Sequence, residues 1–401
     1  MHFATHCLSC GGTIRDPVAV ACPGCGGPLG FRYAATAPDW DDRHAGSLWR
    51  YWRLLPLADP ATAVSLGEGG TPLLRSRLGL GPSLYLKDET RNPTGSHKDR
   101  ALSVALSIAR AQGATTSVVV SAGSTGIANA AYAARAGLRS IIVMARGAPA
   151  ERVYPVWALG SRLVEVDADI DGLIETVRGF AGRAGIVVAS TTRTSNPWQA
   201  EGSKTIAYEI VEQLGRAPDW MVVPVGGGST IAAIHRGFAD LVRLGVIARV
   251  PRLLGVVPST HDNLAVAWRQ GIVDRDRFFA LPAADPPTLL TKLAHAHPPD
   301  GPEALAAIRE SNGLVLAVGE EAAIDGARHL GRSDGLYVEP SSGVVLPAIE
   351  RLLADGEAGP ADAIVALLCG SGFRETFAVM PRRPAAVERR ALGDLAAILD
   401  P

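Results

Sequence analysis

The chain has 401 residues, which is long enough for two or three domains that each bury a core. Hydrophobic residues make up 47% and charged residues 20%, a composition that excludes an intrinsically disordered protein. The formal net charge of -1 and the pI near 6.8 exclude a strongly basic surface, so we expect a small-molecule ligand and neither nucleic acid nor membrane as a partner. Residues 1–6 have neither a basic start nor an apolar run, which predicts a cytoplasmic protein without a secretory signal.

Two Cys-x-x-Cys pairs lie near the N-terminus, and each is followed by two glycines. The glycines let backbone N–H groups turn toward the sulfur atoms, so the pattern predicts a zinc ribbon over residues 1–33 with a closed, structural ion. Disulfides, which suit an oxidising compartment, and a knuckle that folds without metal are the alternatives. The predicted ligands are Cys7, Cys10, Cys22 and Cys25.

From about residue 84 onward, short apolar runs alternate with helical patterns. The predicted strands are residues 84–87, 117–120, 139–144, 162–166, 186–189, 220–224, 252–257, 314–317 and 363–368. The predicted helices are residues 98–112, 127–136, 150–159, 170–184, 199–214, 230–244, 303–311, 320–329 and 342–353. Residues 283–302, rich in Ala, Pro and His, are predicted to form a surface loop. The alternation predicts an α/β protein whose parallel sheets carry helices on both faces and bind ligands at the carboxyl ends of strands.

The first of three glycine-rich junctions is Asn-Pro-Thr-Gly-Ser-His-Lys, residues 92–98, which opens a predicted helix. A lysine at a helix start opposes the macrodipole, so Lys98 has a weak structural explanation. If the amine is partly desolvated, its pKa falls and it becomes a nucleophile.

The second junction leaves a predicted strand and enters a helix. Its three successive glycines let backbone N–H groups converge on one phosphate group at the helix N-terminus. The segment lacks the endings of a Walker loop and of a dinucleotide fingerprint, and a flexible turn is the alternative. The predicted phosphate loop is Gly226, Gly227, Gly228, Ser229 and Thr230.

The third junction, residues 121–126, precedes a helix of small residues. Its backbone amides and hydroxyls can surround a carboxylate or a ring hydroxyl. Close packing of a small-residue helix is the structural alternative. A nucleophilic lysine, a phosphate loop and an anion-binding loop together fit one cofactor better than any other, pyridoxal 5'-phosphate (PLP).

The segment Asn-Pro-Thr-Gly-Ser-His-Lys-Asp-Arg-Ala, preceded by Glu68-Gly-Gly-Thr-Pro-Leu73 and Lys87-Asp-Glu89, resembles the fold-type II PLP enzymes, and most closely the threonine synthases. The resemblance covers about residues 65–376, and the cysteine-rich start is similar to that of some prokaryotic threonine synthases. It implies a homodimer with two doubly wound parallel-sheet domains. The implied boundaries are residues 34–97 and 193–380 for the larger domain, 98–192 for the smaller domain and 381–401 for a C-terminal tail.

The resemblance also implies roles for single residues. Lys98 carries PLP as a Schiff base and acts as the acid/base catalyst, and residues 226–230 bind its phosphate. Cys369 meets the pyridine nitrogen, and a neutral group there favours elimination and replacement over transamination. His97 donates to the cofactor phosphate or fills space, and Glu339 lines the cofactor pocket.

Three positions depart from the threonine synthase pattern. His97 stands where that family usually has a phenylalanine, and it is more similar to the tryptophan synthase β subunit. Ser124 stands where the threonine synthases have an asparagine that meets the PLP ring hydroxyl. Gln199 stands where the family has an arginine that binds the substrate phosphate, for which a neutral amide is a weaker partner, and Arg193 is a candidate to compensate. The predicted substrate-binding residues are Ser121, Ala122, Gly123, Thr125, Thr194 and Gln199.

We therefore expect a PLP-dependent lyase of the threonine synthase type, which converts O-phosphohomoserine into threonine and phosphate. The alternative is a β-replacement or dehydratase enzyme, similar to cysteate synthase or to serine/threonine ammonia-lyase. A regulatory or scaffold protein that has lost catalysis is a third hypothesis, and the retention of Lys98 and the glycine loop argues against it.

Overall fold

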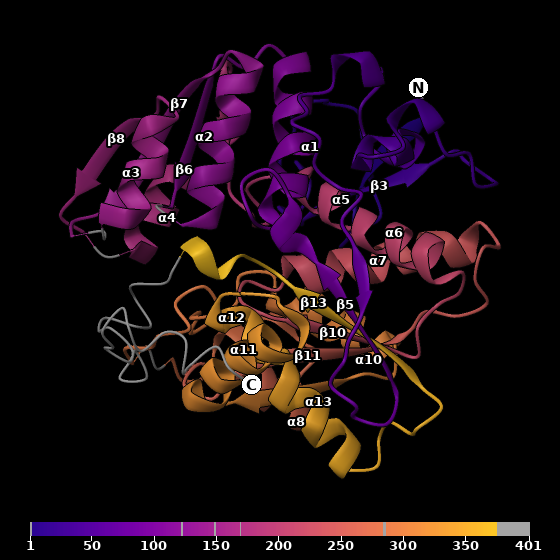
Figure 1. Cartoon of the computed structure of the whole chain (residues 1–401). Coiled ribbons are helices and arrows are strands. Elements are labelled where there is room, and N and C mark those ends of the chain that lie inside the picture. Colours follow the sequence, from indigo (N-terminus) through magenta and orange to yellow (C-terminus); the bar gives the residue numbers. More distant parts are fainter. Residues whose placement is uncertain (1, 122, 148–149, 169, 284–285, 375–401) are drawn as a thin grey trace, which may run out of the picture.

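The computed structural model describes residues 2–121, 123–147, 150–168, 170–283 and 286–374. These residues form three sheets, and helices pack around the two larger ones (Figure 1). The predicted tail 381–401, residues 375–380 of the predicted larger domain and Ala122 lie outside the described residues.

The N-terminal module, residues 3–33, is an antiparallel sheet in the order β2-β1-β3. Strand β1 (Phe3–Cys7) pairs with β2 (Thr13–Ile14) on one side and with β3 (Leu29–Tyr33) on the other. The buried core of this module consists of Cys7, Ile14, Cys22 and Leu29. So small a core needs further stabilisation, and the metal ion predicted from the cysteine spacing would supply it.

The larger sheet has the strand order β12-β11-β10-β13-β5-β4, and only β4 runs antiparallel to its neighbour. Its strands are β4 (Leu73–Arg75), β5 (Ser83–Asp88), β10 (Trp220–Pro224), β11 (Arg252–Pro258), β12 (Leu314–Val318) and β13 (Ala363–Leu368). Along β10, Met221 and Val223 face one core whereas Trp220 and Val222 face another, because side chains alternate between the faces of a strand. Burial on both faces explains why these strands are continuous apolar runs in the sequence.

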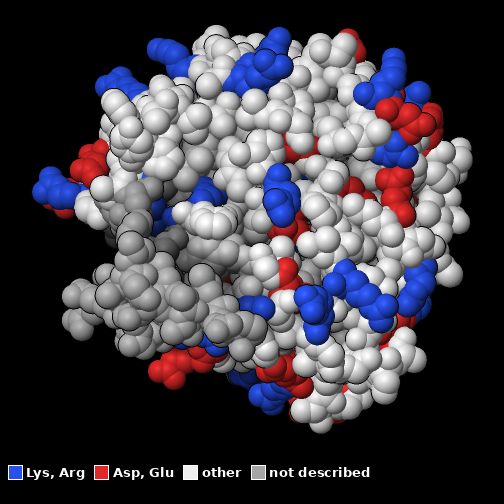
Figure 2. All heavy atoms as spheres, in the orientation of Figure 1, with Lys and Arg blue, Asp and Glu red and all other residues white. Residues whose placement is uncertain are grey.

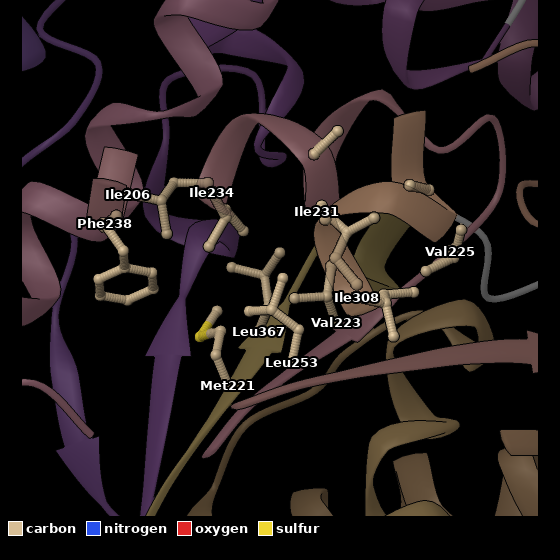
Figure 3. Close-up of a cluster of buried hydrophobic side chains, with 14 of the residues drawn as sticks. Ile206, Met221, Val223, Val225, Ile231, Ile234, Phe238, Leu253, Ile308 and Leu367 are labelled. Carbon is tan, nitrogen blue, oxygen red and sulfur yellow. The ribbon is translucent and has the colours of Figure 1, made fainter. Parts of the chain in front are cut away.

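Helices cover both faces of the larger sheet. One face packs against α6 (Thr205–Leu214), α7 (Ser229–Arg243), α8 (Asn263–Arg269) and α10 (Gly301–Glu310), and the other against α11 (Glu320–Asp334) and α13 (Val345–Ala354). In the first core, Ile231, Ile234 and Phe238 of α7 pack beside Met221 and Val223 of β10 (Figure 3). This packing fixes the start of α7 at the carboxyl end of β10. Shorter helices are α5 (Gln199–Ser203), α9 (Arg275–Phe279) and α12 (Pro340–Gly343).

The smaller sheet is parallel throughout and has the order β8-β7-β6-β9. Its strands are β6 (Thr116–Val120), β7 (Arg139–Ala145), β8 (Arg162–Val166) and β9 (Ile186–Val188). The helices around it are α1 (Lys98–Ala111), α2 (Ser124–Ala136), α3 (Ala150–Ala158) and α4 (Ile170–Arg178). Short 3₁₀ helices are η1 (Asp42–His44), η2 (Leu48–Leu54), η3 (Pro60–Thr62), η4 (Glu89–Arg91) and η5 (Gly372–Arg374).

All nine predicted strands are confirmed to within one residue at each end. The predicted helix 199–214 is divided into α5 and α6, and the predicted helix 342–353 into α12 and α13. The short elements β4, α8 and α9 were not predicted, nor were the strands of the N-terminal module. The prediction that residues 283–302 form a surface loop is wrong from residue 290 onward, because Leu290, Leu293 and Asp300 are buried.

Charged side chains of both signs are interspersed on the face shown in Figure 2, as expected from a net charge of -1. Within the described part of that face, no large area carries a single sign of charge. Of the helices that the structure describes, none is both long enough and apolar enough to cross a membrane.

Candidate active site

The segment before α1 lies against the end of β13. Ser96 and Gly370 form an antiparallel bridge, and the backbone N–H of His97 donates to the carbonyl oxygen of Cys369 at 2.9 Å. Lys98 is the first residue of α1, so this pairing brings its side chain beside Cys369. Two predicted site residues that are far apart in the sequence are thereby brought together.

The Lys98 side chain is half-buried, and its ammonium makes no hydrogen bond or ion pair with any residue that the structure describes. Burial lowers the pKa of Lys98, and the nearby ammonium of Lys292 lowers it further. The carboxylates of Glu339 and Asp300 act in the opposite direction without reversing the result. A neutral, unpaired amine is the form of lysine that attacks a carbonyl carbon.

Two neutral groups lie next to Lys98. Burial raises the pKa of the Cys369 thiol, and the Glu339 carboxylate adds to this effect. Burial lowers the pKa of His97, whose Nδ1 lies 3.1 Å from the carbonyl oxygen of Cys369. The hydroxyl of Ser342 accepts the backbone N–H of Cys369 at 2.9 Å and fixes this turn. The thiol predicted to meet the pyridine nitrogen is therefore neutral.

The glycine loop joins β10 to α7, and residues Ser229 and Thr230 already belong to the helix. A Cβ atom on Gly226 would lie 2.6 Å from the carbonyl oxygen of Lys292, and one on Gly228 would lie 2.5 Å from that of Asp300. These glycines are needed because residues 292–300 pack directly on the loop. The prediction of a surface loop failed here because this segment covers the glycine loop, with the Asp300 N–H bound to the carbonyl oxygen of Gly227 at 2.8 Å.

The third junction contains a buried hydroxyl group without a partner. Ser124 is buried, and its Oγ makes no hydrogen bond among the described residues. An unsatisfied buried hydroxyl costs about 1–3 kcal/mol, which a polar ligand group such as the PLP ring hydroxyl can recover. Ser121 Oγ accepts the N–H of Gly123 at 3.1 Å, and Thr125 is half-buried in the first turn of α2. The residues present therefore fit the cofactor.

The remaining predicted substrate residues precede and begin α5. Gln199 is 1% exposed, and its Nε2 donates to the hydroxyl of Ser229 at 2.6 Å, so it contacts the glycine loop. Thr194 is half-buried nearby in the chain. The guanidinium of Arg193 donates to the carbonyl oxygen of Leu29 at 2.7 Å, in the N-terminal module. Arg193 is thus held by that module, and the structure gives no support to its predicted role at a substrate phosphate.

Sequence reasoning missed Lys292, whose Nζ forms an ion pair with the carboxylate of Glu339. The same carboxylate lies against Gly370, where a Cβ atom would be 2.5 Å from Oε2. A signal was present, because the chain has four lysines among 39 basic residues, at positions 87, 98, 204 and 292. In a chain that otherwise uses arginine, these lysines mark positions where a compact ammonium is required.

The four N-terminal cysteines form a cluster in which all sulfur atoms lie within 4.8 Å of one another. The backbone N–H groups of Cys10 and Ser9 donate to Cys7 Sγ at 3.4 and 3.3 Å, and these bonds outweigh burial and contribute to lowering the pKa of the Cys7 thiol to about 6. The cluster is compatible with a metal ion held by four sulfur ligands.

A family model, a sequence relative and two solved structures are similar to this chain. The family model described as pyridoxal-phosphate dependent enzyme matches residues 64–370. Threonine synthase of Methanocaldococcus jannaschii is 32% identical over 389 residues, which covers 93% of each chain. The structure of maize serine racemase matches with a TM-score of 0.60 at 20% identity, over 82% of this chain and 91% of that one. The processed form of threonine deaminase isoform 2 from Solanum lycopersicum matches with a TM-score of 0.62 at 18% identity, over 82% of each chain. The two structural matches carry the fold alone.

Proposed function

The chain belongs to the family of pyridoxal-phosphate dependent enzymes with fold type II, and we propose that within it this protein is a lyase of the threonine synthase type. The observation that carries the proposal is the half-buried, unpaired amine of Lys98 beside the neutral thiol of Cys369. The similarity to threonine synthase of Methanocaldococcus jannaschii over 93% of each chain supports the choice of reaction.

The contacts at the site support an assignment of the cofactor residues. When bound, PLP withdraws electrons and stabilises negative charge at the substrate Cα. We assign its phosphate to the glycine loop and the N-terminus of α7, its ring hydroxyl to Ser124 and its ring nitrogen to Cys369. Lys98, the first residue of α1, would hold the cofactor covalently, and His97 precedes it as a neutral group.

The proposed substrate is O-phosphohomoserine, a small amino acid with a phosphate leaving group. The amine of Lys98 accepts the proton from Cα and returns protons later, while phosphate leaves Cγ and water adds at Cβ to give threonine. We assign substrate binding to the third junction and to the start of α5. These residues are Ser121, Gly123, Thr125, Thr194 and Gln199, together with Ala122 outside the described residues.

A second candidate is a β-replacement or dehydratase reaction on a substrate without a phosphate. It is favoured by Gln199, a neutral residue that is already bound to Ser229, and by Arg193, which is engaged by the N-terminal module. Neither side chain is a free cation for a substrate phosphate. The fold match to a threonine deaminase structure agrees with either candidate.

The experiment that separates the two candidates is a substrate screen. The PLP-loaded protein is incubated with O-phosphohomoserine, O-phosphoserine, serine and threonine, and released phosphate and product masses are followed. We expect equal amounts of threonine and phosphate from O-phosphohomoserine and neither from the Lys98→Ala variant. Keto acid from serine or threonine, without phosphate release from O-phosphohomoserine, would establish the second candidate instead.

We also propose a structural zinc ion at Cys7, Cys10, Cys22 and Cys25. Metal analysis of the purified protein should find one zinc per chain, and replacing Cys22 by serine should lower that content. A homodimer and a cytoplasmic location stay predictions.

A further inference from the structure

The N-terminal module is joined to the body by buried polar contacts. The hydroxyl of Tyr33 donates to Oε2 of Glu201 at 2.7 Å, and the guanidinium of Arg193 donates to the carbonyl oxygen of Leu29 at 2.7 Å. Arg193 is 2% exposed, and it also forms an ion pair with Glu201 at 3.5 Å. Because these groups are buried, losing one partner leaves the other unsatisfied.

Leu29 lies directly opposite a cysteine of the sulfur cluster. In the antiparallel pairing of β1 and β3, Cys7 is the register partner of Leu29. The N–H of Leu8 also donates to the carbonyl oxygen of Pro28 at 2.9 Å. The position of the Leu29 carbonyl therefore depends on the same strand pair that carries Cys7.

The backbone of Arg193 reaches the glycine loop through a single residue. Its N–H donates to the two carboxylate oxygens of Asp300 at 3.1 and 3.2 Å. The N–H of Asp300 donates in turn to the carbonyl oxygen of Gly227, and the Asp300 carbonyl packs against Gly228. A continuous set of contacts thus runs from Cys7 through Leu29, Arg193 and Asp300 to the glycine loop.

A second connection runs in parallel. Glu201, which binds Tyr33 of the module, lies in α5 two residues after Gln199. Gln199 donates to Ser229, the first residue of α7. Both connections end on the loop to which we assign the cofactor phosphate.

We propose that Arg193 is a positioning residue that couples the folded N-terminal module to the affinity for PLP. The proposal rests on the function proposed above. A loop with three successive glycines has much conformational freedom, so it depends on outside contacts to present its N–H groups to a phosphate. Asp300 supplies such a contact, and Arg193 joins Asp300 to the module. Loss of metal from the four cysteines then weakens PLP binding without any change in the residues that touch PLP.

The test is an absorbance titration of the PLP-free protein with PLP. We expect Arg193→Met to weaken PLP binding by about 10-fold, the size of a typical coupling between sites. Removing the metal from the wild-type protein with EDTA should weaken PLP binding by a similar factor. In Arg193→Met the same treatment should have little further effect, because the connection is already broken. Arg193→Lys, which keeps a donor and the charge, should retain most of the affinity.

Arg243 offers a matched control. The guanidinium of Arg243 donates at 2.6 Å to the carbonyl oxygen of Ala35, which lies just after the module. Arg243 is the last residue of α7, at the opposite end of this helix from the glycine loop. Arg243→Met also removes a bond from a guanidinium to a backbone carbonyl, here an exposed one, and its PLP affinity should equal that of the wild type. Equal losses in Arg193→Met and Arg243→Met would overturn the proposal, because they would indicate general destabilisation.

A second variant keeps the test decisive if Arg193→Met does not fold, which circular dichroism reports. Asp300→Ala removes the acceptor of the Arg193 N–H, whereas Asp300→Asn retains one. The proposal expects weak PLP binding in the first variant and affinity near the wild type in the second. An affinity within twofold of the wild type in Asp300→Ala would contradict it. Failure of the wild-type protein to bind PLP would contradict the proposed function instead.

Discussion

Lys98 and Arg100 lie two residues apart at the start of α1, yet only the charge of Arg100 has partners among the described residues. Arg100 is fully buried, and its guanidinium binds the carboxylates of Glu89 and Glu209 at 2.6–2.7 Å. Burial alone would lower the pKa of Arg100, but Glu209 and Glu89 raise it well above its usual value. Lys98 has no such partner among the described residues. Removal of either partner of the Arg100 cluster would leave a buried charge uncompensated, whereas the amine of Lys98 is unpaired and available for chemistry.

Lys87 shows that a lowered pKa is not sufficient to mark a reactive lysine. Burial lowers the pKa of Lys87 as it does for Lys98. However, Nζ of Lys87 binds Glu209 and the carbonyl oxygen of Thr71, both at 2.7 Å. A lysine so fully bonded cannot approach a ligand. Lys87 also lies at the carboxyl end of the sheet, in β5, so the missing partner is what distinguishes Lys98.

Replacing Lys98 by alanine should give the largest effect on function. Activity should fall by roughly 10²- to 10⁴-fold, because a positioned acid/base group is lost. The visible absorbance band of protein-bound PLP should disappear. The unfolding midpoint of the PLP-free protein should stay the same or rise, because the amine has no bond to lose. A large drop in that midpoint would show that Lys98 is as structural as Arg100.

Replacing Arg100 by methionine should give the opposite pattern. It leaves Glu89 and Glu209 buried and short of positive charge, so the free energy of unfolding should fall by about 3–5 kcal/mol. Urea unfolding of the PLP-free protein measures this loss. At a temperature where the variant is folded, it should still bind PLP covalently through Lys98. A loss below about 1 kcal/mol, typical of surface pairs, would break the comparison.

Much of the fold was predictable from the sequence, because strands buried on both faces appear as apolar runs. The buried cluster of Arg100, Glu89 and Glu209 was not predictable, because its members come from three separate segments and no local sequence pattern indicates their contact. Residues 283–302 were wrongly predicted to be a surface loop because their Pro- and His-rich composition is typical of exposed loops. Leu290, Leu293 and Asp300 of this segment are nevertheless buried. The backbone carbonyls of Lys292 and Asp300 pack on the glycine loop, where Gly226 and Gly228 leave space for them.

The candidate site likewise contains residues that could be predicted from the sequence and residues that could not. Lys98, the glycine loop and the segment of Cys369 were predictable, because each follows or precedes a recognisable element. Lys292 and Asp300 were not, because they act through contacts between distant segments. The scarcity of lysine was the one sequence signal for Lys292.

Replacing Lys292 by methionine should move the pH dependence of the site. Lys292 lowers the pKa of Lys98, whereas Glu339 raises it. Loss of the Lys292 charge also leaves Glu339 without its ion pair, and both changes raise the pKa of Lys98. The neutral amine then forms at higher pH, so capture of PLP by the PLP-free protein should slow several-fold near pH 7. Stopped-flow absorbance across pH measures the midpoint, which should not move in Lys292→Arg. A midpoint that falls in the methionine variant would reverse the assigned charges.

Replacing Ser124 by alanine should give the smallest effect and the clearest separation of function from stability. The Ser124 hydroxyl is buried without a hydrogen bond, so its removal should leave the stability of the PLP-free protein unchanged or slightly higher. Affinity for PLP should fall by about 2- to 12-fold, the value of one hydrogen bond of about 0.5–1.5 kcal/mol. Ser103→Ala is a matched control, because its buried hydroxyl already binds the carbonyl oxygen of Val64 at 2.8 Å. That variant should lose stability and keep its intrinsic affinity for PLP. If Ser124→Ala instead lost stability and kept its affinity, the hydroxyl would be a structural group, and the assignment of the PLP ring hydroxyl to Ser124 would fail.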